Sequence, residues 1–281
     1  MKLNSHPISP SKNKQCIILV PVYKPTLSSD EIASLRQLER ILGRWEIRLV
    51  CPESLDMSAY DSLTNQPLVK ERFANYFFEG IAGYNTLMRD NAFYRRFCAY
   101  EYLLIYQLDA WVFRDELEYW CAQGYDYIGA PWFEHYRSHE EGKKLWHVGN
   151  GGFSLRRTEK FIQCTLPDVP VYTLWGIISH ANRHILRNII RYIKYPNNMG
   201  WFIKHQANTW EDGFFCCDLA ETHHALKCPK PEVAARFSFE CSPEYLFSLT
   251  GGKLPFGCHA WRKMQFEDFW SKYINSSVTS V

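Results

Sequence analysis

Two short apolar runs near the start of the chain most constrain its fold. Residues 16–23 read CIILVPVY, and residues 46–51 read EIRLVC. Both runs are too short for helices and rich in branched aliphatic residues, which is typical of strands buried in a parallel sheet. Between them, Ser28 offers a helix N-cap, apolar residues recur at helical spacing from Ile32 to Leu42, and Gly43 offers a stop. The pattern predicts a β-α-β unit with a right-handed crossover.

The rest of the chain continues this alternation. A second buried strand is predicted over 101–107, a short strand over 125–130, and helices over 84–99, 114–121 and 158–164. Residues 133–147 read as an exposed loop and 149–152 as a tight turn, whereas 68–80 are ambiguous. We expect an α/β fold with a mixed, mostly parallel central sheet flanked by helices. It forms one domain, 15–270, between a disordered lead, 1–14, and a flexible tail, 271–281.

Composition narrows the function. A net charge of +2 argues against nucleic-acid binding through bulk charge. The ten cysteines lack the spacing of a disulfide framework, which favours a protein with reduced thiols. Residues 1–15 contain no apolar signal-peptide core, and no run of about 18 apolar residues occurs, so we expect a cytoplasmic protein.

Residues 172–195 form a basic amphipathic stretch, with isoleucines and leucines among Arg183, Arg187, Arg191 and Lys194. Two interpretations stay open. The stretch is either a surface helix packed on the body, or a helix lying on an anionic membrane face, where a lipid-linked acceptor would be found.

Asp109 is the first candidate for chemistry. It directly follows the apolar run 102–108, and ligands of open α/β sheets bind at the carboxyl ends of the strands. A carboxylate there can hold a divalent metal that bridges phosphates. Position alone equally allows an Asp that caps a following helix.

Three later segments are weaker candidates when each is taken alone. Gly149, Asn150, Gly151 and Gly152 permit close approach of another molecule, or form an ordinary turn. Glu211 and Asp212 beside Trp210 offer a general base next to a stacking ring, or a helix N-terminus with acids in its first turn. His259 follows a glycine near the end of the chain and is a metal ligand or a structural histidine.

A competing zinc site is poorly supported. Its ligands would come from Cys216, Cys217, His223, His224 and Cys228, whose spacing matches no usual paired pattern. The chain also lacks a Gly-x-Ser-x-Gly elbow, a Walker loop and a Gly-x-Gly-x-x-Gly turn after the first strand. A serine hydrolase, a kinase and a dehydrogenase are therefore disfavoured.

Taken in order, these segments resemble the GT-A glycosyltransferases, and more closely a bacterial branch found among surface-polysaccharide genes. The resemblance spans roughly residues 16–262. It rests on Val20–Tyr23 as the first nucleotide-binding strand, Gln107–Asp109 in the place of the Asp-x-Asp motif, Asn150–Arg156 as the glycine-containing strand, the pair Glu211 and Asp212, and the late His259.

The resemblance implies a GT-A-like fold whose nucleotide-binding half is about 15–132 and whose acceptor half is about 133–270. It implies transfer of a sugar from a nucleotide-sugar donor, most simply a UDP-sugar, to a saccharide or lipid-linked saccharide, in the cytoplasm or at the inner membrane face. The implied roles are donor binding by Pro21, Val22, Tyr23, Gln107 and Asp109; acceptor binding by Trp132, Asn150, Gly151, Gly152 and Trp210; Mn²⁺ or Mg²⁺ binding by Asp109 and His259; and a base at Asp212 or, second, Glu211.

One residue departs from the family pattern. Gln107 stands where the first acid of Asp-x-Asp is expected, so it can hydrogen-bond a hydroxyl but adds no charge. Metal binding would then rest on Asp109, His259 and the donor's diphosphate. Two rival functions stay open: a metal-dependent hydrolase of sugar nucleotides, and a non-catalytic carbohydrate-binding protein. The sequence leaves the sugar, the nucleotide, the stereochemical outcome and the oligomeric state undetermined.

Overall fold

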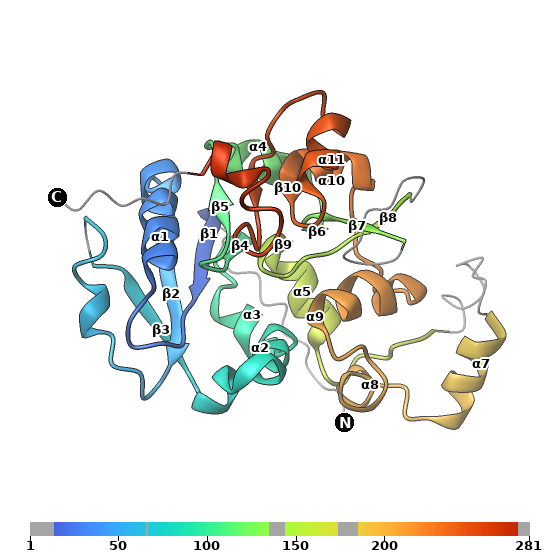
Figure 1. The fold of residues 1–281 in the computed structure, drawn as a ribbon. Coiled ribbons are helices and arrows are strands. Elements are labelled where there is room, and N and C mark those ends of the chain that lie inside the picture. The colour runs from blue at the N-terminus through green and yellow to red at the C-terminus, as the bar shows by residue number, and fades with distance from the viewer. Residues whose placement is uncertain (1–13, 66, 135–143, 174–184, 275–281) are drawn as a thin grey trace.

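A six-stranded sheet forms the centre of the protein (Figure 1). The structure is a computed structural model that describes residues 14–65, 67–134, 144–173 and 185–274. The strand order is β3-β2-β1-β4-β9-β6. The strands are β1 Lys14–Pro21, β2 Glu46–Pro52, β3 Val69–Phe73, β4 Tyr100–Tyr106, β6 Tyr127–Ile128 and β9 Phe153–Arg157. The first four pair in parallel, and β9 is antiparallel to both β4 and β6, which confirms a mixed, mostly parallel sheet.

Both faces of the sheet are covered by helices. Ile17 and Leu19 of β1 face one core, which also contains side chains of α3 (Asn91–Arg96) and α5 (Thr158–Thr165). Ile18 and Val20 face the opposite core, which contains side chains of α1 (Ser29–Leu42) and α4 (Leu117–Ala122). Because neighbouring strand residues point to opposite faces, burial on both sides requires the continuous apolar run seen in the sequence.

The start of α1 follows from its sequence. The Ser28 side chain accepts a hydrogen bond from the Glu31 backbone N–H, and the Glu31 carboxylate accepts one from the Ser28 N–H at 2.8 Å. This reciprocal pair satisfies two N–H groups that a helix start leaves without partners. The predicted β-α-β unit is thus confirmed in its elements and nearly in its bounds.

Two predictions of local structure were wrong. The single helix expected over 84–99 is instead α2 (Gly80–Met88) followed by α3, because the Asp90 side chain caps a new start by accepting from the Ala92 N–H. The exposed loop expected over 133–147 contains part of β8 (Leu145–Val148), which pairs with β7 (Pro131–Phe133). Residues 135–143 of that stretch lie outside the described residues.

The C-terminal third consists of further short elements. They are α7 Ile185–Lys194, α8 Met199–His205, α9 Glu211–Gly213, α10 Pro231–Phe237, β10 Ser238–Phe239, α11 Pro243–Leu249 and β11 Gly257–Cys258. Of these, α9, β10 and β11 bring residues to the carboxyl edge of the sheet. The chain continues from α9 through a π-helical turn, 214–218, and a 3-10 turn, 219–221. Other 3-10 turns are Ser58–Tyr60, Asn75–Phe78 and Trp270–Lys272. Strand β11 pairs with β10 and with β5 (Trp111–Val112), so the end of β11 lies beside the segment that follows β4.

The amphipathic stretch expected over 172–195 is only partly described. Residues 185–194 are helical, as α7, residues 172 and 173 are not, and 174–184 lie outside the described residues. Across the described ranges, every helix is too short or too polar to cross a bilayer. All ten cysteines are free thiols.

Candidate active site

The carboxyl ends of β1 and β4 open into a cavity of about 660 Å³. Because β9 is antiparallel to β4, the start of β9 reaches the same edge and brings Gly151 and Gly152 there. The start of α9 and the ends of β10 and β11 close the remaining sides. All but one of the predicted site residues line this cavity: Pro21, Val22, Tyr23, Gln107, Asp109, Asn150, Gly151, Gly152, Trp210, Glu211, Asp212 and His259.

The one predicted site residue that does not line the cavity formed by the described residues is Trp132. It lies on β7 with its indole over the backbone of Gly149, where a Cβ would come within 2.0 Å of the ring. The same ring stacks on Trp146, with centroids 6.2 Å apart. The structure therefore places Trp132 in packing around β7 and β8, and its role in acceptor binding stays a prediction.

The first charged cluster surrounds His259. The ring Nε2 lies 3.0 Å from Oδ1 of Asp109 and 3.2 Å from Oε1 of Gln107, and Nδ1 lies 3.2 Å from Oε1 of Glu240. The Lys263 ammonium donates to the other oxygen of Asp109, also at 3.0 Å. A carboxylate on each side of one imidazole fixes its orientation and leaves Nε2 directed toward Asp109 and Gln107.

These contacts set the charge of both groups. Burial would by itself raise the pKa of Asp109, but His259 and Lys263 hold it well below its usual range. Burial would lower the pKa of His259, but Asp109 and Glu240 raise it to about 10. The His259 ring is therefore held in its protonated form, with its positive charge shared by both ring nitrogens and Nε2 facing oxygens of Asp109 and Gln107.

This donor set fits a divalent cation. Imidazole nitrogen, carboxylate oxygen and amide oxygen are all ligands of Mn²⁺-type ions, and three such atoms face one another here. The second ring nitrogen of His259, Nδ1, lies within hydrogen-bond distance of the Glu240 carboxylate. Metal-binding histidines commonly have a carboxylate in this place. Among the described residues, however, no three His, Cys, Asp or Glu side chains form a complete metal cage. A metal here would need ligand oxygens from elsewhere.

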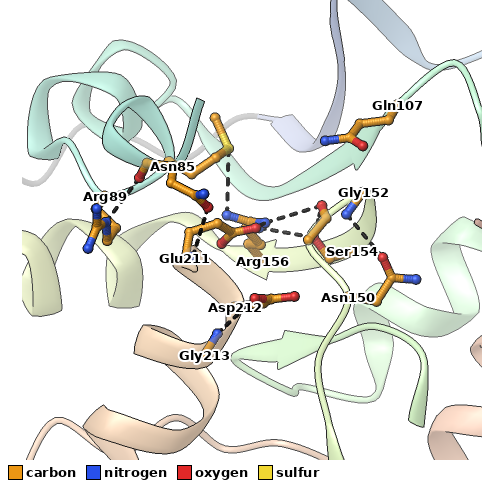
Figure 2. A network of polar contacts seen from close by, with 12 residues as sticks. Asn85, Arg89, Gln107, Asn150, Gly152, Ser154, Arg156, Glu211, Asp212 and Gly213 are labelled. Carbon is orange, nitrogen blue, oxygen red and sulfur yellow. Dashed lines mark hydrogen bonds and ion pairs between the residues drawn. The ribbon is translucent and has the colours of Figure 1, made fainter. Parts of the chain in front are cut away.

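A second charged cluster surrounds the buried side chain of Arg156 (Figure 2). Arg156 of β9 is fully buried, and its Nη2 donates to Oε1 of Glu211 at 2.8 Å. Its other nitrogens donate to Ser154 Oγ at 3.0 Å and Tyr94 Oη at 2.9 Å. The backbone N–H of Glu211 donates to Asn85 Oδ1 at 2.9 Å. This network ties the start of α9 to both β9 and α2.

Burial raises the pKa of Glu211 to about 7, although Arg156 opposes that shift. Its Oε1 is committed to Arg156, and the side chain is only 2% exposed. Glu211 thus lines the cavity chiefly as part of an internal ion pair.

Asp212, the next residue, faces a different environment. Figure 2 shows its carboxylate turned away from the Glu211–Arg156 pair, toward the strand that carries Gly152. Oδ1 accepts from the Gly213 N–H at 2.8 Å, and burial raises the pKa of Asp212 above its ordinary value. The hydrogen bonds from Gly213 and Gly151 N–H groups oppose that shift, and the charge of Glu240 adds to it. Asp212 is a partly buried, cavity-facing carboxylate without a salt-bridge partner in the described chain.

Gly151 and Gly152 lie between the two clusters and must be glycines. A Cβ on Gly151 would lie 1.7 Å from Oε1 of Glu211, and a Cβ on Gly152 would lie 2.1 Å from Nε2 of His259. Asn150, just before them, has φ of 70° and accepts from the Gly152 N–H at 3.1 Å. The predicted tight turn is confirmed, and its glycines are required by close approach of catalytic-type side chains.

Several buried polar atoms on the cavity wall have no hydrogen-bond partner among the described residues. They include Asn150 Nδ2, Glu211 Oε2 and Glu240 Oε2. An unpartnered buried polar atom costs about 1–3 kcal/mol, so such atoms normally find a partner. Tyr84 Oη and Trp261 Nε1 also belong to this set, and such a mixture of donors and acceptors around one cavity suits a ligand with several hydroxyl groups.

Sequence reasoning missed Arg156, Glu240 and Lys263 as site residues. Arg156 was part of the quoted glycine-containing segment but had no role assigned, because nothing local marks an arginine on a strand as buried. Glu240 follows a two-residue strand, which has no periodicity to detect. Lys263 lies four residues after His259, and that spacing was its only available signal.

Comparison with known families gives one match. Residues 68–259 match the model of a family described as "Protein of unknown function (DUF5672)". The chain belongs to this family. The matched range holds both charged clusters except Lys263, and it leaves out β1, α1 and β2. No curated protein sequence matches the chain.

Several solved structures are similar in part. An active-site mutant of LgtC superposes with a TM-score of 0.49 at 10% identity, over 86% of each chain. The glycosyltransferase GlyE of Streptococcus pneumoniae TIGR4 gives 0.45 at 12% identity, over 95% of this chain and 62% of that one. Core-mannan synthase A of Aspergillus fumigatus, in a Mn/GDP form, gives 0.37 at 12%, over 54% and 62%. At this level of overlap, none of them assigns a role to a residue of this chain.

Proposed function

We propose that this protein is a glycosyltransferase that binds a nucleotide-sugar donor, with a divalent cation, in the cavity at the carboxyl edge of the sheet. One observation carries the proposal. The cavity holds a His259–Asp109 cluster beside Gly152 and a separate, partly buried carboxylate, Asp212, which has no salt-bridge partner among the described residues. Glycosyl transfer needs this division, because the leaving diphosphate and the attacking hydroxyl require opposite kinds of help.

The donor end is assigned to the strand ends of β1 and β4. Tyr23 is 61% exposed there, and its ring offers a flat face for a nucleobase. Pro21, Val22 and Gln107 form the adjoining wall. The proposed donor is a UDP-sugar.

Charge around the donor end explains the need for a cation. Three basic residues line it, and each is paired with a carboxylate: Lys24 with Glu31, Arg262 with Asp30, and Lys263 with Asp109. His259, the other positive group of the lining, is itself flanked by Asp109 and Glu240, so the described residues offer no unpaired positive charge for a diphosphate. Asp109, His259 and, as a neutral oxygen ligand, Gln107 are the residues that would hold a divalent metal. When bound, such a metal supplies positive charge to the departing diphosphate.

The acceptor end is assigned to Asp212 and its surroundings. Its carboxylate takes the proton from the acceptor hydroxyl as that hydroxyl attacks the anomeric carbon, with inversion as the outcome. Asn150, the backbone of Gly151 and Gly152, and the exposed ring of Trp210 orient the two sugars and keep water away. The proposed acceptor is a saccharide or lipid-linked saccharide of a bacterial surface polysaccharide. We assign Glu211 to positioning α9. We assign Trp132 no part in binding the acceptor.

The test is calorimetric titration of the purified protein with UDP and with GDP, each with and without Mn²⁺. Micromolar binding that requires both Mn²⁺ and Asp109 is expected, so Asp109→Ala should abolish it. Asp61→Asn is the matched control, because Asp61 also pairs with a lysine, Lys70, but outside the cavity. Binding unaffected by Asp109→Ala would sink the donor assignment. Release of free sugar at the same rate with and without a saccharide acceptor would favour a hydrolase.

A further inference from the structure

Helix α7 presents its apolar face to solvent. Leucine and isoleucine recur along it at intervals of three and four residues, which places them in one stripe. The most exposed are Leu186 at 74%, Ile190 at 58% and Ile193 at 77%. Ile185 and Ile189 extend the stripe and are also exposed. Surface helices normally turn such a stripe toward the core, so α7 is inverted.

Polar contacts hold α7 in this orientation. Asn188 is 1% exposed, and its amide donates to the backbone oxygen of Glu221 at 3.4 Å. Arg187 forms an ion pair with the Glu221 carboxylate, and Arg191 donates to Tyr172 Oη at 3.3 Å. The polar side of the helix is therefore the side attached to the protein. Figure 1 shows α7 at the periphery, away from the central sheet.

A contiguous exposed stripe of this kind indicates a binding surface, because monomeric proteins seldom leave one open to water. The charge of the region indicates what binds. From Val169 to Trp210 the sequence contains no Asp or Glu. Within the described part of that stretch, the basic residues are Arg187, Arg191, Lys194 and Lys204. A partner whose surface is complementary to this region is therefore apolar and negatively charged.

Aromatic residues extend this surface toward α8. Tyr195, directly after α7, stacks on Trp201 with ring centroids 5.2 Å apart, and Trp201 stacks on His205 at 4.8 Å. Tyrosine and tryptophan are enriched where a membrane meets water, since their rings have an apolar body and a polar tip. A stripe of aliphatic residues, flanking basic residues and adjacent aromatic rings are the three features of a helix that lies in a bilayer interface.

We infer that α7 docks this protein on an anionic lipid bilayer, with the stripe Ile185–Ile193 in the acyl boundary and Lys194 and Lys204 at the headgroups. The inference stands independently of glycosyl transfer. The described part of α7, ten residues, is about 15 Å long, which suits a helix lying in the plane of the surface. A second copy of the chain is disfavoured as the partner, because it would bring two stretches of the same charge together.

The test is flotation of the full chain with vesicles of phosphatidylcholine containing 30% phosphatidylglycerol, against vesicles of phosphatidylcholine alone. We expect at least about tenfold stronger partitioning to the anionic vesicles, and weakening in high salt because the basic contacts are screened. The triple variant Leu186→Ser, Ile190→Ser, Ile193→Ser should lose at least tenfold in partitioning. These side chains are exposed, so thermal unfolding should be unchanged; the single variant Ile193→Ser serves if the triple variant is destabilised.

The matched control replaces three exposed apolar residues elsewhere: Val69→Ser, Tyr119→Ser and Leu249→Ser. It should partition like the parent chain. Equal binding to both vesicle types, or undiminished binding by the triple variant, would overturn the inference. So would a dimer, detected by light scattering without lipid, that the triple variant dissociates, since the stripe would then be an interface between copies.

Discussion

The two charged clusters of the cavity are built in opposite ways. Glu211 is ion-paired to Arg156, and both side chains are inaccessible to solvent. Asp109 is 32% exposed, and one of its partners, Lys263, is 72% exposed. Separating Glu211 from Arg156 would cost much free energy, because it would leave an uncompensated buried charge. The outer cluster can exchange the ammonium of Lys263 for a ligand at little cost, because exposed ion pairs contribute little stability.

The comparison shows that role follows surroundings and not residue type. Glu211 and Asp212 are adjacent carboxylates, yet one faces an arginine and the other faces the cavity. Gly151 touches the inner cluster and Gly152 touches the outer one, so a single peptide unit separates the two clusters. If this division is correct, variants of the two clusters should fail in different assays.

The largest effect should come from Asp212→Asn. Loss of a general base costs roughly 10²–10⁴-fold in rate, so kcat should fall by that factor. Donor affinity should change little, because Asp212 is assigned to the acceptor end. The measurement pairs initial rates of sugar transfer with calorimetric titration of the nucleotide.

Glu211→Gln is the matched comparison, since it removes the same charge one residue earlier. It should keep most of the parent kcat, because the Glu211 side chain is only 2% exposed and is held in place by Arg156 through Oε1. If Glu211→Gln lost turnover while Asp212→Asn kept it, the two carboxylates would have been assigned the wrong way round.

The next effect concerns stability. Arg156→Met leaves Glu211 buried without its partner, and breaking a buried ion pair costs about 3–5 kcal/mol. We expect urea denaturation to show a loss of that order. The neighbouring Arg157→Met should cost about 1 kcal/mol or less, because Arg157 is partly exposed and its ion pairs, at 3.7 and 3.8 Å, are long.

A double variant sharpens the same point. Arg156→Met with Glu211→Leu removes both charges, so it should recover part of the stability lost by Arg156→Met alone. If the two substitutions were simply additive, the pair would not be the unit that ties α9 to β9.

A smaller effect is expected from Glu240→Gln. The substitution keeps an oxygen that can accept from Nδ1 of His259 but removes the negative charge behind the ring. Losing such a supporting carboxylate typically weakens metal binding 10–100-fold. The measurement is the Mn²⁺ dissociation constant by calorimetry, without substrate. Unchanged Mn²⁺ affinity would mean that Glu240 merely packs against the ring.

The sequence predicted the parts of this site that depend on local pattern. The apolar runs placed Tyr23 at the end of one predicted strand and Asp109 just after another, and the parallel sheet then required those ends to meet. What it did not predict depends on pairing between distant short elements. Glu240 and Trp132 lie at or next to strands of two or three residues, which carry no usable periodicity. Whether Trp132 faces a ligand or Gly149 is decided only when β7 pairs with β8.

The smallest effect is a displacement of the pH–rate profile. Burial raises the pKa of Asp212, and the charge of Glu240 raises it further. A base must be unprotonated to act, so activity should fall as pH decreases through this pKa, with a midpoint above the 3.8 of an ordinary aspartate. In Glu240→Gln the midpoint should move to lower pH, because one nearby negative charge is gone.

The measurement is kcat/KM against pH at saturating Mn²⁺, for the parent chain and Glu240→Gln, with Glu71→Gln as a control. Glu71 pairs with Arg48 on the far strands of the sheet and does not line the cavity formed by the described residues, so its removal should leave the midpoint in place. The residual activity of Asp212→Asn should lack the acidic limb altogether. A limb that persists in Asp212→Asn would belong to another group, and the division between an outer donor cluster and a separate acceptor base would then have to be redrawn.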